Sequence, residues 1–342
     1  MSVRRASRPA WAGALLFATL ATGAAAAETA IKFSLASKFE SPAAAFLLPL
    51  DKGYYKAEEL NVAIDAAADS LESITRVASG NYDMGIADTN ALIKFRDTNP
   101  QMAVKAVFMI YNQPPFAVIG RKSRGISVPK DLEGKKLGAP TADSAFAEWP
   151  IFVKANGIDT SKVTIENVGL PVREPMLAAG QVDAVTGTSF SSFVDLKDKG
   201  VPVNDIVVLL MADYGVDLYG NAIIVNPKFS AEHPDAVKGF LRAFLRGLKE
   251  TVKSPAAAVA TVLDRNDAAR KDSEVERLQI AIRDNIVTPE VKANGYGGID
   301  ESRFAHAIDQ LALAYKFKSA KPKPGDIFDG SYLPAAADRK VD

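Results

Sequence analysis

The sequence predicts an α/β protein of two lobes, with mixed, mainly parallel sheets, flanking helices and two chain crossovers at a hinge. The first observation is the length: 342 residues suggest two domains of the usual ~100–200 residues. The second is that short β-like segments alternate with helical segments along most of the chain. The third is a pair of breaks near residues 113 and 222. We therefore expect residues 28–112 and 222–342 to form lobe 1 and residues 113–221 to form lobe 2, with a cleft between them.

The first stretch of lobe 1 alternates strands and helices. Residues 31–35 alternate apolar and polar side chains, which is the period of a strand. Gly53 and Gly80 each follow a helical segment, where glycine commonly ends a helix, and Thr89 or Asn90 can cap the next one. The expected strands are 31–35, 61–66, 84–87 and 103–110, and the expected helices are 42–52, 71–79 and 89–97.

Lobe 2 begins after Asn112-Gln113-Pro114-Pro115, because two prolines restrict the local backbone. Its expected strands are 116–120, a segment around 137, 163–167, 184–187 and 206–211, and its helices are 144–156 and two centred near 177 and 193. A strand at 222–225 and the break Asn226-Pro227 then return the chain to lobe 1.

The remainder of the chain is predicted to be helical. From Val237 to Val252, apolar residues recur every three or four positions, which is the pattern of an amphipathic helix with one core-facing side. Further helical segments are expected at 255–266, 272–283 and 300–315. The tail from Lys321 contains three prolines and is expected to lie on the surface as a strap.

The N-terminus has the three parts of a secretory signal peptide. Arg4, Arg5 and Arg8 precede an apolar stretch at 11–21, and Ala25-Ala26-Ala27 provides small residues for cleavage before Glu28. The apolar stretch is shorter than the ~20 residues that span a membrane. Cleavage after residue 27 would leave 38 basic and 41 acidic residues. We therefore expect a soluble protein exported to the periplasm.

Most enzymatic chemistry is not supported by the residues present. The chain has no Cys, which excludes disulfides, thiolate metal sites and cysteine nucleophiles. Its two His residues, His233 and His306, are far apart in sequence, and no phosphate-binding or nucleophile motif occurs. Balanced charge argues against nucleic-acid binding. We expect no catalytic residue, no metal and no cofactor.

Candidate binding residues instead follow the strands. In open α/β sheets, ligands bind beyond the carboxyl ends of strands. The polar groups at these positions are Ser37, Lys38, Phe39 and Glu40; Asp88, Thr89 and Asn90; Thr141, Asp143 and Ser144; and Thr186, Gly187, Thr188, Ser189 and Phe190. Any one of them could serve only as a helix cap, but their convergence on one cleft favours a binding site.

Four motifs carry a resemblance to a known family. They read Asp51-Lys52-Gly53-Tyr54-Tyr55-Lys56 with Leu60-Asn61-Val62; Ala78-Ser79-Gly80-Asn81-Tyr82-Asp83-Met84-Gly85; Asp131-Leu132-Glu133-Gly134-Lys135-Lys136-Leu137-Gly138; and Gly180-Gln181-Val182-Asp183-Ala184. In this order they resemble periplasmic substrate-binding proteins of ABC importers for nitrate, sulfonates, taurine and pyrimidine precursors. The resemblance implies a type II two-lobe periplasmic binding fold that closes on one solute and docks on a membrane permease.

The solute is less well defined by this resemblance. Many family members have an aromatic-rich segment after the last motif, whereas this chain has no Trp there. The candidate residues include two cations, Lys38 and Arg173, and three acids, Glu40, Asp88 and Asp143. This balance of charge favours a neutral or zwitterionic, heteroaromatic organic solute. The side chains that could stack on it are Phe39, Tyr111, Trp149, Phe190 and Tyr219.

The sequence thus predicts a monomeric periplasmic receptor for a small-molecule solute, with an ABC permease as its partner. Two other functions are compatible with the same fold. One is a sensor protein that presents its ligand to a membrane kinase, and the other is an enzyme similar to the pyrimidine synthase of thiamine biosynthesis. The signal peptide and the lack of Cys disfavour the enzyme.

Overall fold

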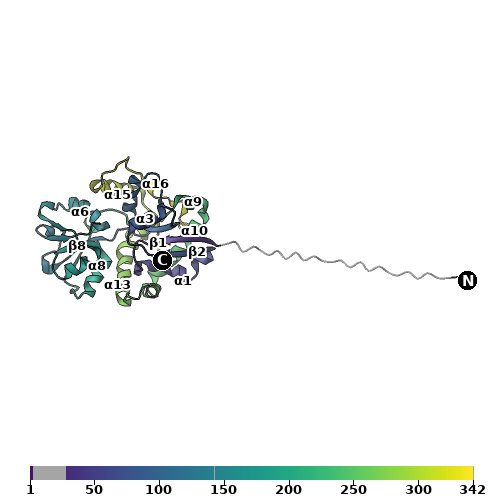
Figure 1. The fold of residues 1–342 in the computed structure, drawn as a ribbon, viewed down its shortest axis with the longest axis horizontal. Coiled ribbons are helices and arrows are strands. Elements are labelled where there is room, and N and C mark those ends of the chain that lie inside the picture. Colours follow the sequence, from purple (N-terminus) through teal and green to yellow (C-terminus); the bar gives the residue numbers. More distant parts are fainter. Residues whose placement is uncertain (3–27, 142, 342) are drawn as a thin grey trace.

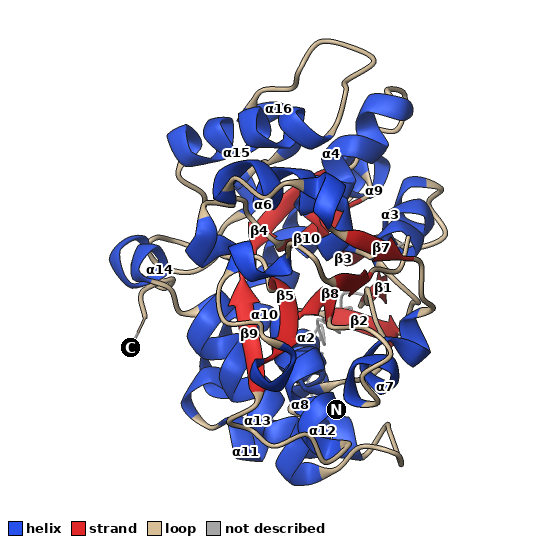
Figure 2. Ribbon diagram, turned by 90° about the vertical axis from the view of Figure 1, so that its left-hand side faces the viewer, coloured by secondary structure: helices blue, strands red, loops and turns tan. Residues whose placement is uncertain are grey.

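Two five-stranded sheets, each flanked by helices, form the centre of the computed structural model (Figures 1 and 2). The structure describes residues 1–2, 28–141 and 143–341. The predicted signal peptide therefore lies, apart from its first two residues, outside the described residues. In Figure 1 the teal segment with α6, β8 and α8 occupies the left of the molecule, and the segment with β1, β2 and α1 lies to its right.

The strand directions confirm a mixed α/β fold. The first sheet has the order β2 (Leu60–Asp65), β1 (Thr29–Ser34), β3 (Met84–Asp88), β10 (Asn221–Val225) and β4 (Lys105–Met109). The second has the order β7 (Thr164–Glu166), β6 (Lys136–Gly138), β8 (Ala184–Thr188), β5 (Phe116–Arg121) and β9 (Ile206–Leu210). Only β10 in the first sheet and β5 in the second run antiparallel to their neighbours.

Those two antiparallel strands directly follow the chain crossovers. The chain leaves the first sheet after β4, enters the second at β5, and returns from β9 to β10. The crossing segments are hydrogen-bonded together: Gly220 N donates to Tyr111 O at 2.9 Å, and Ile110 N donates to Asn221 O at 2.9 Å. The crossings fall at the predicted breaks, so we retain residues 28–112 with 222–342 and residues 113–221 as the proposed lobes.

The helices follow the sequence pattern with two interruptions. The early helices are α1 (Ala44–Asp51), α2 (Tyr54–Ala57), α3 (Ser70–Ala78), α4 (Thr89–Thr98), α5 (Ser144–Ala147), α6 (Trp149–Asn156), α7 (Arg173–Ala178) and α8 (Ser189–Asp198). The later ones are α9 (Pro227–Glu232), α10 (Pro234–Lys253), α11 (Pro255–Ala258), α12 (Ala260–Leu263), α13 (Lys271–Ala281), α14 (Pro289–Asn294), α15 (Glu301–Ala314) and α16 (Pro324–Ile327). The segment 144–156 divides at Glu148, because Pro150 has no N–H for the carbonyl of Phe146. The segment 255–266 also divides, into α11 and α12.

The apolar stripe of α10 packs into the core beside the first sheet. Phe240 lies 5.1 Å from Phe33 and 4.9 Å from Tyr55 between ring centroids, and all three rings are buried. α10 also crosses α1 closely, since a Cβ on Gly247 would lie 2.1 Å from the ring of Pro49. A side chain there would force the two helices apart, which explains why glycine interrupts the helical stripe.

The C-terminal tail packs more deeply than a surface strap. Ile327 and Phe328 are buried, and Asp329 N donates to Ala106 O at 2.8 Å along the edge of β4. The tail therefore covers this edge of the first sheet. Within residues 28–141 and 143–341, no helix has both the length and the apolar character required to cross a bilayer.

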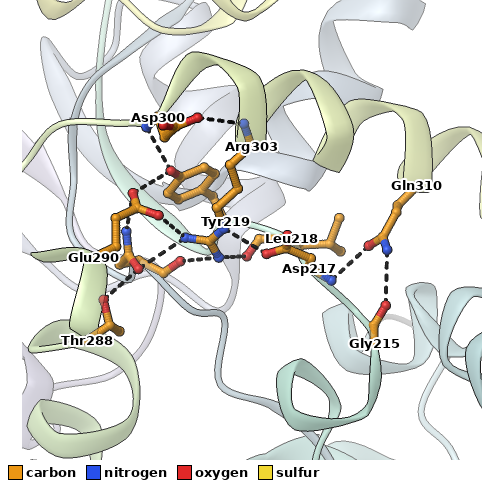
Figure 3. Close-up of polar contacts among 10 residues, drawn as sticks. Gly215, Asp217, Leu218, Tyr219, Thr288, Glu290, Asp300, Arg303 and Gln310 are labelled. Carbon is orange, nitrogen blue, oxygen red and sulfur yellow. Dashed lines mark hydrogen bonds and ion pairs between the residues drawn. The ribbon is translucent and has the colours of Figure 1, made fainter.

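Arg303 of α15 joins both crossing segments (Figure 3). Its guanidinium donates to Asn112 O at 3.0 Å and to Leu218 O at 3.1 Å, so one side chain contacts the backbone of both crossings. It also forms ion pairs with Asp217 at 2.7 Å and with Glu290 at 2.9 Å. This contact fixes α15 to the place where the two sheets are connected.

Candidate ligand-binding cavity

A cavity of about 610 Å³ lies at the carboxyl ends of β1, β3, β6 and β8, which belong to both sheets. A volume of this order suits a small organic molecule. Ten of the predicted site residues line it: Ser37, Lys38, Glu40, Asp88, Tyr111, Asp143, Ser144, Arg173, Thr188 and Phe190. The structure therefore brings together residues from four strand ends that are far apart in the sequence.

Eight other predicted residues lie outside the cavity lining. They are Phe39, Thr89, Asn90, Thr141, Thr186, Gly187, Ser189 and Tyr219. Thr89 Oγ1 donates to Gly220 O at 2.9 Å, and Asn90 Nδ2 donates to Tyr219 O at 2.8 Å, so both hold α4 against the second crossing. Their polar side chains have internal partners, and contact with a solute stays a prediction for them.

The remaining predicted residues also have structural partners. Thr141 Oγ1 donates to Asn167 at 2.9 Å, and the hydroxyl of Tyr219 donates to Glu290 at 2.6 Å. Phe39 packs against the apolar core around α10. Trp149, considered for stacking, is buried 5.8 Å from Phe152 between ring centroids and does not line the cavity. Tyr111 and Phe190 are thus the aromatic candidates from the sequence that border the cavity.

Three carboxylates at the cavity cap helices. Asp69 Oδ1 accepts from Glu72 N at 2.8 Å at the start of α3, Asp88 Oδ1 accepts from Ala91 N at 2.8 Å at the start of α4, and Asp143 Oδ1 accepts from Ala145 N at 3.3 Å at the start of α5. A capping carboxylate satisfies an N–H group that would otherwise lack a partner in the first turn. Side chains of the protein itself therefore already occupy the first turns of these helices.

Asp88 is a cavity carboxyl with a raised pKa. It is buried, and burial raises its pKa from the usual 3.8 to about 7, because the ionised form loses its hydration. The nearby Glu148 carboxylate raises the pKa further, whereas the Ala91 N–H and Lys94 lower it. Lys94 and Glu148 form an ion pair of 2.8 Å beside it. At neutral pH, Asp88 therefore exchanges between its neutral and ionised forms.

Arg173 is a buried cation at the wall formed by the second sheet. Its Nη2 lies 2.6 Å from Glu174, and its Nε donates to the same carboxylate at 2.8 Å. Its Nη1 lies 3.7 Å from Asp143, which is beyond hydrogen-bonding distance. The space for this guanidinium depends on Gly187, since a Cβ there would lie 2.9 Å from Arg173 Cζ. Gly187 thus positions Arg173.

Ion pairs and a hydrogen bond connect α8 to α13 next to the cavity. Arg277 of α13 pairs with Asp195 of α8 at 3.1 Å, and Ser273 Oγ donates to Asp198 at 2.7 Å. Lys197 also contacts Glu276. Asp195 lines the cavity, so its pair with Arg277 lies directly at the cavity wall.

Sequence reasoning missed several lining residues. Asp69 and Ser70 follow β2 and obey the same strand-end rule as the predicted groups, so the signal was present. Glu174 stands beside the predicted Arg173. Asp195 lies in the later part of α8 and Lys199 directly follows that helix; they give no local signal, because only the packing of α8 brings them to the cavity.

Comparison with known proteins gives one family and several relatives. The model of the family described as "NMT1/THI5 like" matches residues 42–258. The riboflavin-binding protein RibY of Chloroflexus aurantiacus is 29% identical over 208 residues, covering 60% of this chain and 57% of that protein. The 4-amino-5-hydroxymethyl-2-methylpyrimidine phosphate synthase of Schizosaccharomyces pombe is 26% identical over 213 residues, covering 60% of each. The match thus spans about three fifths of these relatives' own length.

Solved structures show the same fold at low identity. The periplasmic aliphatic sulphonate-binding protein SsuA from Escherichia coli superimposes with a TM-score of 0.68 at 12% identity, covering 84% of this chain and 87% of that one. The alkanesulfonate-binding protein SsuA from Xanthomonas axonopodis pv. citri, bound to MOPS, gives 0.65 at 10% identity, covering 89% and 100%. The predicted periplasmic binding fold is thereby confirmed.

Proposed function

The chain belongs to the NMT1/THI5-like family, and from this premise we propose that it is the periplasmic solute-binding component of an ABC import system. It captures a small organic solute between its two lobes and delivers it to a membrane permease. The observation that carries the proposal is the cavity lined from both sheets, which the chain connects through two crossings that lie side by side. A solute that contacts both walls favours the closed arrangement, because it binds that state better.

The periplasmic location is part of the proposal. It is supported by the periplasmic proteins of the same fold and by the signal-peptide pattern of residues 1–27. Expression of the full chain in a Gram-negative host, followed by osmotic shock and intact mass measurement, tests it. We expect a released protein that begins at Glu28. Retention of the uncleaved chain in the cytosol would contradict this location.

Solute capture is tested by native mass spectrometry of the gently purified protein. We expect a retained small molecule, and removal of that molecule should lower the unfolding free energy, since ligand at ~100 times its dissociation constant adds about 2.7 kcal/mol. Ser144→Trp should abolish retention by filling the cavity, whereas Ser331→Trp, at an exposed tail position, should not. Equal retention in both variants would place the solute elsewhere.

Import is distinguished from sensing by deletion of the protein from its host. If the protein serves an importer, uptake of the retained solute should fall. Unchanged uptake with loss of a transcriptional response to the solute would identify the sensor alternative.

A second candidate function is a pyrimidine synthase, favoured by the names of several curated relatives. That enzyme type is expected to use Cys and His at its site. This chain has no Cys, and neither His233 nor His306 lines the cavity. Incubation with pyridoxal phosphate and iron, followed by detection of a pyrimidine product, tests this alternative. Product formation would replace the binding function.

A further inference from the structure

The charges at the cavity are unequal. In the described part of the chain, six carboxylates line it and only three cations. The carboxylates are Glu40, Asp69, Asp88, Asp143, Glu174 and Asp195, and the cations are Lys38, Arg173 and Lys199. A ligand that carries only negative charge would enter against this excess, so the charge balance itself restricts the class of solute.

Local ion pairs account for part of the charge. Lys38 pairs with Glu40 at 3.1 Å, Arg173 pairs with Glu174 at 2.6 Å, and Arg277 outside the lining pairs with Asp195 at 3.1 Å. Among the described residues, Asp69 and Asp88 have no ion pair, and Asp143 lies 3.7 Å from Arg173; all three aspartates cap helices. The first turns of α3, α4 and α5 would attract an oxyanion if they were open, but here a carboxylate of the chain occupies each.

Two buried groups, one from beside each sheet, can bind different ends of a solute. Asp88, only 2% exposed, ends β3 of the first sheet and presents a carboxylate that accepts hydrogen bonds. Arg173, only 8% exposed, begins α7 beside the second sheet. Its Nη1 lies 3.7 Å from Asp143 and makes no hydrogen bond within the described residues, whereas Nε donates to Glu174 and Nη2 to Ser192. An arginine N–H group that is not hydrogen-bonded within the protein can donate to an acceptor atom of a ligand.

We propose that the solute is dipolar: a protonated amine or other N–H donor lies against Asp88, and a carbonyl or carboxylate oxygen accepts from Arg173 Nη1. This inference rests on the proposed function and names the class of solute. It explains how binding favours closure, because the donor end and the acceptor end engage groups on different sheets. A molecule with acceptor atoms only, such as a simple sulfonate or nitrate, has no hydrogen to donate to the ionised carboxylate of Asp88.

The retained molecule in the native mass spectrum provides the first test. A solute with both a nitrogen donor and an acceptor oxygen supports the inference. A retained anion with acceptor atoms alone overturns it but leaves the proposed function standing. If nothing is retained, and tyrosine, tyramine and 4-hydroxyphenylacetate produce no shift in unfolding temperature, both fail. Among these probes we expect tyrosine to stabilise most and 4-hydroxyphenylacetate least, and the reverse order would overturn the inference.

A pair of matched variants tests Asp88. Asp88→Asn keeps an oxygen that caps α4, since Asn and Asp cap equally well, but it removes the negative charge. Asp300→Asn makes the same change at the start of α15, outside the cavity. We expect the fraction of protein carrying the retained solute to fall about tenfold in Asp88→Asn and to be unchanged in Asp300→Asn, because a hydrogen bond to a charged group is lost only in the first. Equal retention in Asp88→Asn and the unaltered protein would overturn the assignment of Asp88.

Discussion

The guanidinium of Arg303 lies over the ring of Tyr219, with its central carbon 4.2 Å from the ring centroid (Figure 3). The same guanidinium donates to backbone carbonyls in both crossing segments, at Asn112 and Leu218. The hydroxyl of Tyr219 in turn donates to Glu290, which also pairs with Arg303. This cluster therefore fixes the local geometry of the chain segments that must bend if the lobes move.

Arg303→Gln is expected to destabilise the protein by about 3 kcal/mol, because it leaves the largely buried Glu290 without its cation. Denaturant unfolding measures this loss. Arg246→Gln is the matched control: Arg246 also lies over a tyrosine ring, at 3.7 Å from Tyr54, but its side chain is 63% exposed. Its substitution should cost less than about 1 kcal/mol. Similar losses of unfolding free energy in both variants would show that the cluster around Arg303 stabilises the protein no more than an exposed ion pair does.

Much of the fold was predictable because its signals are local. The strand of residues 31–35 and the stripe of α10 bury one set of side chains, so their periodicity appears in the sequence. The antiparallel directions of β5 and β10 were not individually assigned from the sequence, since a strand's own residues do not specify the direction of its neighbours. They follow from the path of the chain, which crosses between the sheets immediately before each strand.

The cavity was predictable to the extent that its residues follow strands. Asp88 and Asp143 follow this rule, and Asp69 would have been found by applying it to β2. The same rule also selected Thr89 and Asn90, whose side chains bond to the second crossing instead. The pairing of Arg277 with Asp195 joins α13 to α8 across 82 positions of sequence, and no local pattern encodes it.

Asp88 should make the stability of the protein depend on pH. Because its pKa is raised to about 7 in the folded protein from the usual 3.8, the folded state binds this proton more tightly than the unfolded state does. Its contribution to the unfolding free energy is therefore fully present below about pH 4 and is lost as the pH rises toward 7. The pKa of about 7 already includes the effects of the neighbouring Glu148, which raises it, and Lys94, which lowers it.

The effect is measured by unfolding the Asp88→Asn variant and the unaltered protein, both without ligand, at pH 5 and at pH 8. The unaltered protein should lose a few kcal/mol more than the variant between these pH values, since Asn has no proton to release. Asp300→Asn should follow the unaltered protein. A parallel pH dependence in Asp88→Asn and the unaltered protein would show that the Asp88 carboxyl titrates near its ordinary value.

The contacts between α8 and α13 should influence the opening of the cavity. Asp198 accepts from Ser273 and pairs with Arg270 at 3.3 Å, but it does not line the cavity, so Asp198→Asn weakens the closure without altering the solute contacts. We expect a larger radius of gyration by small-angle X-ray scattering for the unliganded variant, and a reduced difference at high salt because screening weakens the ion pair. Asp309→Asn is the control, because Asp309 of α15 forms an exposed ion pair with Lys321. An unchanged radius in Asp198→Asn would show that these contacts do not hold the closed arrangement.

Gly187→Ala tests whether the position of Arg173 depends on the lack of a side chain at residue 187. The added methyl group would lie 2.6 Å from Ser192 Oγ and 2.9 Å from Arg173 Cζ, so the guanidinium must move. We expect a loss of about 1–3 kcal/mol in unfolding free energy, the usual cost of overpacking, together with reduced retention of the solute. Gly325→Ala, where a Cβ would meet no atom within 4 Å, should leave retention unchanged. If Gly187→Ala retained the solute as well as Gly325→Ala does, the position of the guanidinium would not matter for binding.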